Sequence, residues 1–99
     1  MDNNIDKYME AAEILKVLAH PVRLCMVNGL LEKGECNVSF MQSCLKTPQS
    51  TVSQHLQKLK SAGIIEGRRE GLEIYYKIKD ERIGELVRIL TSNTESRRK

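Results

Sequence analysis

Hydrophobic residues recur at steps of three and four along the first third of the chain, which is the spacing of one helix face. The pattern predicts an amphipathic helix over residues 4–18. Its apolar stripe and flanking positions are Ile5, Tyr8, Met9, Ala12, Leu15 and Leu18. His20-Pro21 then interrupts the helix, because the residue before a proline is disfavoured in the helical region.

Two further helices are predicted before residue 47. One starts on Pro21 and continues until Gly34 stops it, and a short one covers residues 37–46. The positions expected to face the core are Leu24, Val27 and Leu31 in the first and Phe40, Met41 and Leu45 in the second.

The segment TPQSTVSQHLQKLKSAG, residues 47–63, has the end signals of a helix. Thr47 is a suitable N-cap, Pro48 fits the first helical position, and Gly63 fits a C-terminal cap. The predicted buried face is Val52, Leu56, Leu59 and Ala62. The outer face is small, polar and almost uncharged, and consists of Gln49, Ser50, Thr51, Ser53, Gln54, His55 and Lys58.

After Gly63 the period changes to that of strands. Two runs rich in β-branched and aromatic residues, 64–69 and 72–78, join around Glu70-Gly71 and predict a hairpin with Arg68 and Arg69 near its tip. A last helix is predicted over 80–92 with Asp80 as its N-cap. Its inward positions are Ile83, Leu86, Val87 and Leu90, and the charged tail 93–99 is expected to be disordered.

The predicted order is four helices, two strands and a helix, which is a mainly α, α+β fold. The third and fourth helices form a helix-turn-helix, and the hairpin that follows is a wing. With 99 residues the chain is expected to form a single domain, residues 1–99. A core of this size is modest, so a dimer that buries more surface is expected.

Charge and composition narrow the function. Residues 46–79 contain seven Lys/Arg against three Asp/Glu, whereas residues 1–35 contain four against six, so the basic surplus surrounds the fourth helix. This favours an acidic partner, of which nucleic acid is the commonest. No apolar run approaches a membrane span, and the start MDNNIDKYME is too polar for a signal peptide, so a cytoplasmic protein is expected.

The polar outer face of the fourth helix can form hydrogen bonds with base edges and phosphates without desolvating full charges. Together with the basic wing it predicts binding to double-stranded DNA. The alternatives are a solvated surface helix and a winged helix that binds a partner protein, although the latter usually presents apolar anchors. An enzyme is disfavoured, since the two histidines, His20 and His55, have no nucleophile, glycine loop or carboxylate pair beside them.

Three stretches also resemble the ArsR/SmtB family of winged-helix repressors: LKVLAHPVRLCMVNGLL at 15–31, PQSTVSQHLQKLKSAGII at 48–65 and EGLEIYYKI at 70–78. The resemblance spans residues 8–92. It implies a homodimer formed through the first and last helices, a helix at 48–62 that enters the major groove, and release from the operator by an effector. It places the DNA contacts at the outer-face residues given above, with Arg68 and Arg69 in the wing.

The resemblance does not identify the effector. Metal-sensing members have a Cys-x-Cys pair where this chain has Asn37 and Ser39 beside Cys36, and others use His and carboxylates on the last helix, which has no histidine here. The chain therefore resembles the metal-site-free, PagR-like or HlyU-like subset, a repressor or anti-repressor with no metal and no cofactor. A metal-responsive repressor with an atypical site is the alternative.

Three cysteines remain as candidates for thiol sensing. In the cytoplasm they are not a disulfide framework. Cys25 is expected to pack as an inert thiol, Cys36 to be the most exposed, and Cys44 to end the short helix before the fourth helix. Eight helical residues would hold Cys36 and Cys44 about 12 Å apart, too far for a disulfide without unwinding.

Overall fold

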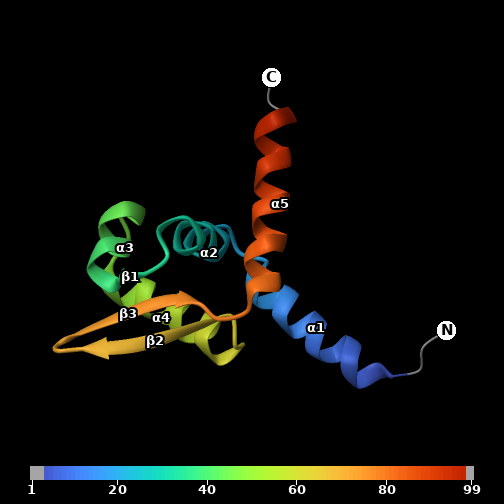
Figure 1. The fold of residues 1–99 in the computed structure, drawn as a ribbon, viewed down its shortest axis with the longest axis horizontal. Helices are drawn as coiled ribbons and strands as arrows, with labels where there is room; N and C mark the ends of the chain where they lie inside the picture. Colours follow the sequence, from blue (N-terminus) through green and yellow to red (C-terminus); the bar gives the residue numbers. More distant parts are fainter. Residues whose placement is uncertain (1–3, 98–99) are drawn as a thin grey trace.

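The computed structural model describes residues 4–97 (Figure 1). It confirms the predicted sequence of helices and the hairpin. In chain order the elements are α1 (Ile5–Leu18), α2 (Pro21–Lys33), β1 (Cys36–Asn37), α3 (Val38–Leu45), α4 (Gln49–Ser61), β2 (Ile65–Glu70), β3 (Glu73–Ile78) and α5 (Glu81–Arg97). In Figure 1, α2, α3, α4 and the sheet form one body, from which α1 and the C-terminal part of α5 project.

Local capping explains where most helices begin and end. The Nδ1 atom of His20 accepts a hydrogen bond from the Val22 N–H at 3.1 Å, so α2 starts with a capped first turn and a proline that needs no donor. Gly34 and Gly63 end α2 and α4 with φ of +92° and +77°, as their predicted stop positions require. The Asp80 carboxylate accepts from the Arg82 N–H at 3.1 Å and caps α5.

The joint between α1 and α2 bends the chain by 95°. Over the described residues, no single helix combines the length and apolar character of a membrane span, and only this bent pair meets the two criteria together.

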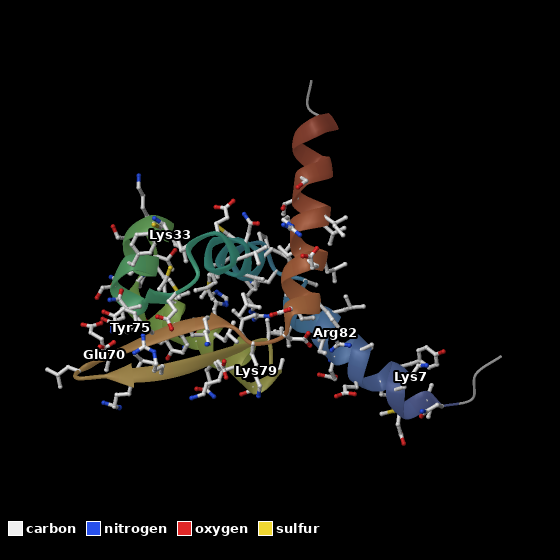
Figure 2. All side chains as sticks on the ribbon, viewed as in Figure 1. Lys7, Lys33, Glu70, Tyr75, Lys79 and Arg82 are labelled. Carbon is white, nitrogen blue, oxygen red and sulfur yellow. The ribbon has the colours of Figure 1, made fainter. Side chains whose placement is uncertain are left out.

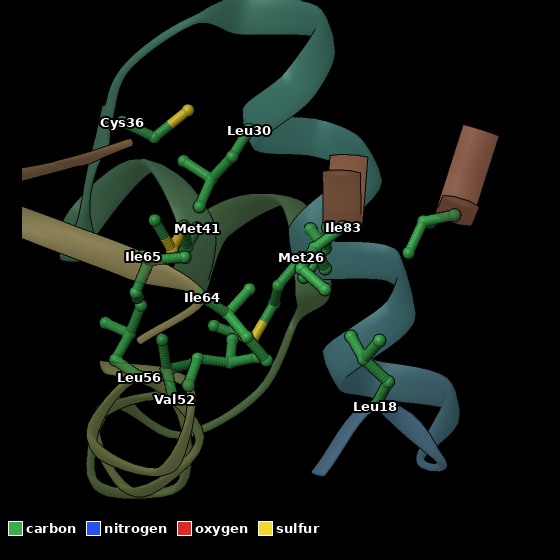
Figure 3. Packing of buried hydrophobic residues seen from close by; sticks show 13 residues of the cluster. Leu18, Met26, Leu30, Cys36, Met41, Val52, Leu56, Ile64, Ile65 and Ile83 are labelled. Atoms are coloured by element: carbon green, nitrogen blue, oxygen red, sulfur yellow. The ribbon is translucent and has the colours of Figure 1, made fainter. Parts of the chain in front are cut away.

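The core lies where α2, α3, α4, α5 and the base of the hairpin meet (Figure 3). Val27, Val52 and Leu59 are fully buried at its centre, with Ile64 and Val87. On α2 the buried residues are Met26, Val27 and Leu30. Leu24 and Leu31, predicted to face the core, are only partly buried, so the buried face is rotated from the predicted stripe. Phe40, predicted to face inward, is exposed on α3 while Met41 beside it is buried.

The sheet has one strand more than predicted. Residues Cys36 and Asn37, predicted as loop and helix, form β1, which pairs antiparallel with β3 in the order β1-β3-β2. A two-residue strand carries no periodicity that the sequence could reveal, so its existence depends on the pairing with Tyr75 and Tyr76. Asn37 then caps α3, its Oδ1 accepting from the Phe40 N–H at 2.9 Å.

The two projecting helices differ from the predictions in the exposure of α1 and in the length of α5. The apolar stripe of α1 is largely uncovered, since Ile5 is 64 % exposed and only Leu18 of this helix is buried. The helical backbone of α5 continues to Arg97, so the predicted end of this helix at residue 92 is wrong. Most of the tail 93–99, predicted to be disordered, is therefore helical. Residues 98–99 lie outside the described part of the chain. The sequence from 91 to 97 contains no glycine or proline that would stop the helix.

Candidate nucleic-acid interface

Helix α4 presents the polar face that the sequence predicts. Val52, Leu56 and Leu59 attach it to the core, and this anchoring turns the opposite side to solvent. The outer-face residues that are exposed are Gln49, Ser50, Ser53, Gln54 and Lys58, with Thr51 partly exposed. The structure therefore brings six of the seven predicted helix residues onto one accessible surface.

The helix starts one residue later than predicted. The Thr47 hydroxyl donates to the Leu45 carbonyl oxygen at 3.1 Å and does not cap α4, so Pro48 occupies the N-cap position. No side chain caps the first turn. The backbone N–H groups of that turn consequently point outward beside the exposed Gln49 and Ser50, an arrangement that favours anionic groups.

His55 is the predicted helix residue that the structure separates from the others. Its Nδ1 accepts a hydrogen bond from Arg23 Nε at 3.1 Å, and its ring centroid lies 4.6 Å from that of His20. Burial lowers the pKa of His55, and the charges of His20, Arg23 and Lys58 lower it further. The lowered pKa favours the neutral form of His55, and the Nδ1 side of its ring is directed towards Arg23 on α2.

Arg23 is a residue that sequence reasoning missed. Besides His55, its guanidinium donates to the Val17 carbonyl oxygen at 2.9 Å near the end of α1. One side chain thus connects α1, α2 and α4 at the joint where the chain bends. The only sequence signal was its place after Pro21 on a helix whose other early residues are apolar.

The two wing arginines have different surroundings. Arg68 Nη2 lies 2.8 Å from Glu35 Oε1, and its Nη1 lies 2.8 Å from Glu70 Oε1. Its guanidinium also lies 5.4 Å from the centre of the Tyr75 ring, close to the hairpin tip (Figure 2). These bonds raise the pKa of Arg68 and lower that of Glu35, and they connect the wing to the segment between α2 and β1.

Arg69 lies on the other face of β2 because successive strand residues alternate. Among the described residues it forms no ion pair, so its charge is available to a partner. Beside it, the tight turn uses Gly71 with φ of +66°, and Leu72 is 98 % exposed at the tip. An apolar side chain held entirely in solvent is a second feature of the wing that the sequence reading passed over.

Two of the three cysteines are placed contrary to the sequence expectations, and Cys44 lies at the end of α3 as predicted. Cys36, expected to be exposed, is 7 % exposed, because β1 pairing with β3 directs its side chain into the core. Cys25, expected to pack as an inert thiol, is exposed, because the buried face of α2 begins at Met26. Cys44 is exposed near the end of α3. In the part of the chain that the structure describes, no three His, Cys, Asp or Glu residues converge as metal ligands.

Comparison with known proteins connects these features to a family. A helix-turn-helix domain family matches residues 18–68. The transcriptional repressor PagR of Bacillus anthracis is 44 % identical over 80 % of this chain and 79 % of its own length. The repressor SmtB of Mycobacterium tuberculosis is 42 % identical over 78 % of this chain and 56 % of its own length. The chain belongs to the ArsR/SmtB family.

Solved structures of the ArsR/SmtB family agree with this fold. The crystal structure of PagR superimposes with a TM-score of 0.80 over 88 % of this chain and 99 % of that one, at 40 % identity. A homodimeric winged helix-turn-helix DNA-binding domain from Mycobacterium bovis, described as a possible ArsR-family regulator, gives a TM-score of 0.84 over 98 % and 89 % of the two chains, at 30 % identity. These relatives are transcriptional regulators, a class that is not enzymatic.

Proposed function

We propose that this protein is a homodimeric transcriptional repressor that binds a specific double-stranded DNA operator. The observation that carries the proposal is the exposed polar face of α4, anchored from behind by three fully or almost fully buried side chains. In a chain of the ArsR/SmtB family, such a face is suited to direct readout in the major groove, where amide and hydroxyl groups match the pattern of base-edge donors and acceptors.

Different residues take different parts in this proposal. Gln49, Ser53 and Gln54 contact base edges or phosphates, and Arg69 contacts the backbone beside the site. Arg68 fixes the angle of the wing through Glu35, and His55 fixes the position of α4 through Arg23. Arg68 and His55 are therefore positioning residues. They are removed from the residues that the sequence predicts to contact DNA directly.

The dimer rests on the two projecting helices. On α1, Tyr8, Met9 and Leu15 are largely exposed along with Ile5, and on α5 the same holds for Ile89 and Leu90. Exposed apolar surface of this kind on two helices that project from the body (Figure 1) favours a second copy of the chain. The relative from Mycobacterium bovis, described as homodimeric, supports a homodimer. Two reading helices related by a two-fold axis would then meet two half-sites of one operator.

The test is fluorescence anisotropy on DNA from upstream of the gene, compared with a scrambled duplex over a range of salt. Gln54→Ala is expected to weaken operator binding by about 1–3 kcal/mol while leaving scrambled DNA unaffected. Gln57→Ala is the matched control, because Gln57 is exposed on the same helix but bonded to Ser61 one turn further on. Equal affinity for operator and scrambled DNA, or equal losses in both variants, would contradict the proposal.

A further inference from the structure

All three cysteines line one small pocket between α2, β1 and α3, with a volume of about 200 Å³. Cys25 and Gly29 line it from α2, and Cys44 lines it from α3. Cys36 contributes the buried sulfur, which lies beside Leu30 in the core (Figure 3). The other walls are mainly Met, Leu and Phe side chains, so the pocket is an apolar space surrounded by soft sulfur atoms.

The thiols differ in their access to solvent. Cys25 and Cys44 are exposed, whereas burial raises the pKa of Cys36 and keeps that thiol protonated. On α3, Cys44 lies one helical turn after Phe40 and Met41, which also line the pocket, whereas Cys25 lies one turn before Gly29. Cys44 is therefore the exposed cysteine whose own helix face supplies large apolar walls. Lys33 lies near the mouth, its Nζ 5.1 Å from the centre of the Phe40 ring above α3 (Figure 2).

We propose that this pocket is the effector site, and that it takes a small, flat, apolar quinone which forms a covalent bond to Cys44. The proposal rests on the repressor function proposed above. A cavity of roughly 150 Å³ lined by apolar side chains can hold a benzene ring, so a single-ring quinone is the size that this pocket admits. Gly29 contributes to the space, since a Cβ built on it meets no atom within 4 Å.

The arrangement of sulfurs favours a carbon electrophile over a metal ion. No three ligating side chains of the described residues converge on one point, and the three cysteines lie on separate elements around the pocket. A zinc ion, for example, would need about four ligands at roughly 2.0–2.3 Å. An apolar ring needs only the pocket walls and one thiolate within reach.

The reaction balances without an external oxidant. The Cys44 thiolate forms a carbon–sulfur bond to a ring carbon next to a quinone carbonyl, and the displaced π electron pair moves onto the oxygen at the far end of the conjugated system. That ring carbon loses its proton as the ring becomes aromatic, and both oxygens end protonated. One thiol and one quinone thus give one thioether-substituted hydroquinone. The two carbonyl carbons are together reduced by two electrons, and the ring carbon that exchanges its hydrogen for sulfur is oxidised by two, so the sulfur keeps the oxidation state of a thiol.

The pocket is coupled through α3 to α4, the helix that we propose contacts DNA. Cys44 lies in the last turn of α3, and Lys46 after it adopts a left-handed conformation with φ of +54° that sets the joint to α4. A ring bonded to Cys44 would fill the space beside Gly29 and fix the end of α3 against α2. Because α3 packs against α4, this would constrain the orientation of the polar face of α4 relative to the wing.

The site itself is tested without DNA. The full-length reduced protein is treated with methyl-1,4-benzoquinone at a stoichiometric amount, and adducts are located by intact-mass and peptide mass spectrometry. We expect one adduct, at Cys44, formed at least about tenfold faster than at Cys25, because burial of a ring raises its local concentration. Iodoacetamide, which is small and polar, should label the two exposed cysteines at similar rates.

Gly29→Leu is the variant that fills the pocket without altering any thiol. It should slow the quinone reaction at Cys44 by about tenfold, the loss of the same ring burial, and leave iodoacetamide labelling nearly unchanged. If Gly29→Leu does not fold, Cys44→Ser takes its place and should abolish the fast adduct, with Cys25→Ser as the control that keeps it. Equal quinone labelling at Cys25 and Cys44, or no effect of these variants, would overturn the assignment of the site.

Operator binding then tests the effector role separately. Quinone treatment should release wild-type protein and the Cys25→Ser variant from operator DNA, but not the Cys44→Ser variant. If the untreated protein does not bind the operator, the proposed repressor function is refuted. The labelling experiment still shows in that case whether the pocket directs a quinone to Cys44. If Cys44 is labelled and DNA affinity is unchanged, the effector role is refuted.

Discussion

Two glycines in helix interiors, Gly29 in α2 and Gly84 in α5, provide a matched test of the packing described above. Alanine in a helix interior is more favourable than glycine by about 1 kcal/mol, because glycine loses more backbone freedom on folding. At Gly29 the added methyl group meets nothing within 4 Å. Gly29→Ala is therefore expected to raise the free energy of unfolding by close to that full amount.

At Gly84 the same substitution meets a neighbour. A Cβ there would lie 3.0 Å from Leu31 Cδ1, at the contact between α2 and α5. The partly buried Leu31 side chain would have to shift by a few tenths of an ångström, and overpacking typically costs about 1–3 kcal/mol where the neighbour cannot relax. Gly84→Ala is expected to be neutral or destabilising, so the two variants should differ by at least about 1 kcal/mol.

The measurement is urea unfolding followed by circular dichroism, at one fixed protein concentration because a dimer's stability depends on it. In thermal melts, Gly29→Ala should raise Tm by about 4–8 °C for a domain of this size. A similar stabilisation in both variants would show that Gly84 does not set the distance between α2 and α5. A destabilised Gly29→Ala would show that the space beside Gly29 is occupied.

Three further predictions concern charge, dimerisation and pH. Arg69→Ala should reduce the slope of log affinity against log salt by about 0.9. Arg68→Ala should change this slope much less, because Arg68 is already paired with two carboxylates. Equal reductions in the two variants would refute this difference. Leu15→Glu should convert the dimer to monomers in sedimentation analysis, and Lys16→Glu on the neighbouring exposed position should not. Because the pKa of His55 is lowered in the folded state, the unfolded chain binds more protons than the folded one. The free energy of unfolding should therefore fall as pH drops from about 7.5 to 5.5. Urea titrations of the His55→Gln variant should show a smaller fall over the same range.

The local sequence was sufficient to locate the helices, the hairpin and the polar face of α4. Pro21, Gly34, Gly63 and Asp80 specify the ends of helices through bonds within a few residues, and these predictions are confirmed. The spacing of Val52, Leu56 and Leu59 determined which side of α4 faces the core, and hence which side is left for a partner. Such signals can be read from sequence because the interacting groups are close along the chain.

Only the tertiary structure decided the roles of several individual side chains. His55 turns from the reading face to Arg23, 32 residues away, and Arg68 is neutralised by Glu35, 33 residues away. Cys36 becomes buried because a two-residue strand pairs with β3, and the three cysteines line one pocket because residues of α2, β1 and α3 meet around it. No periodicity records these pairings, since each depends on the distance between elements that the hydrophobic core brings together.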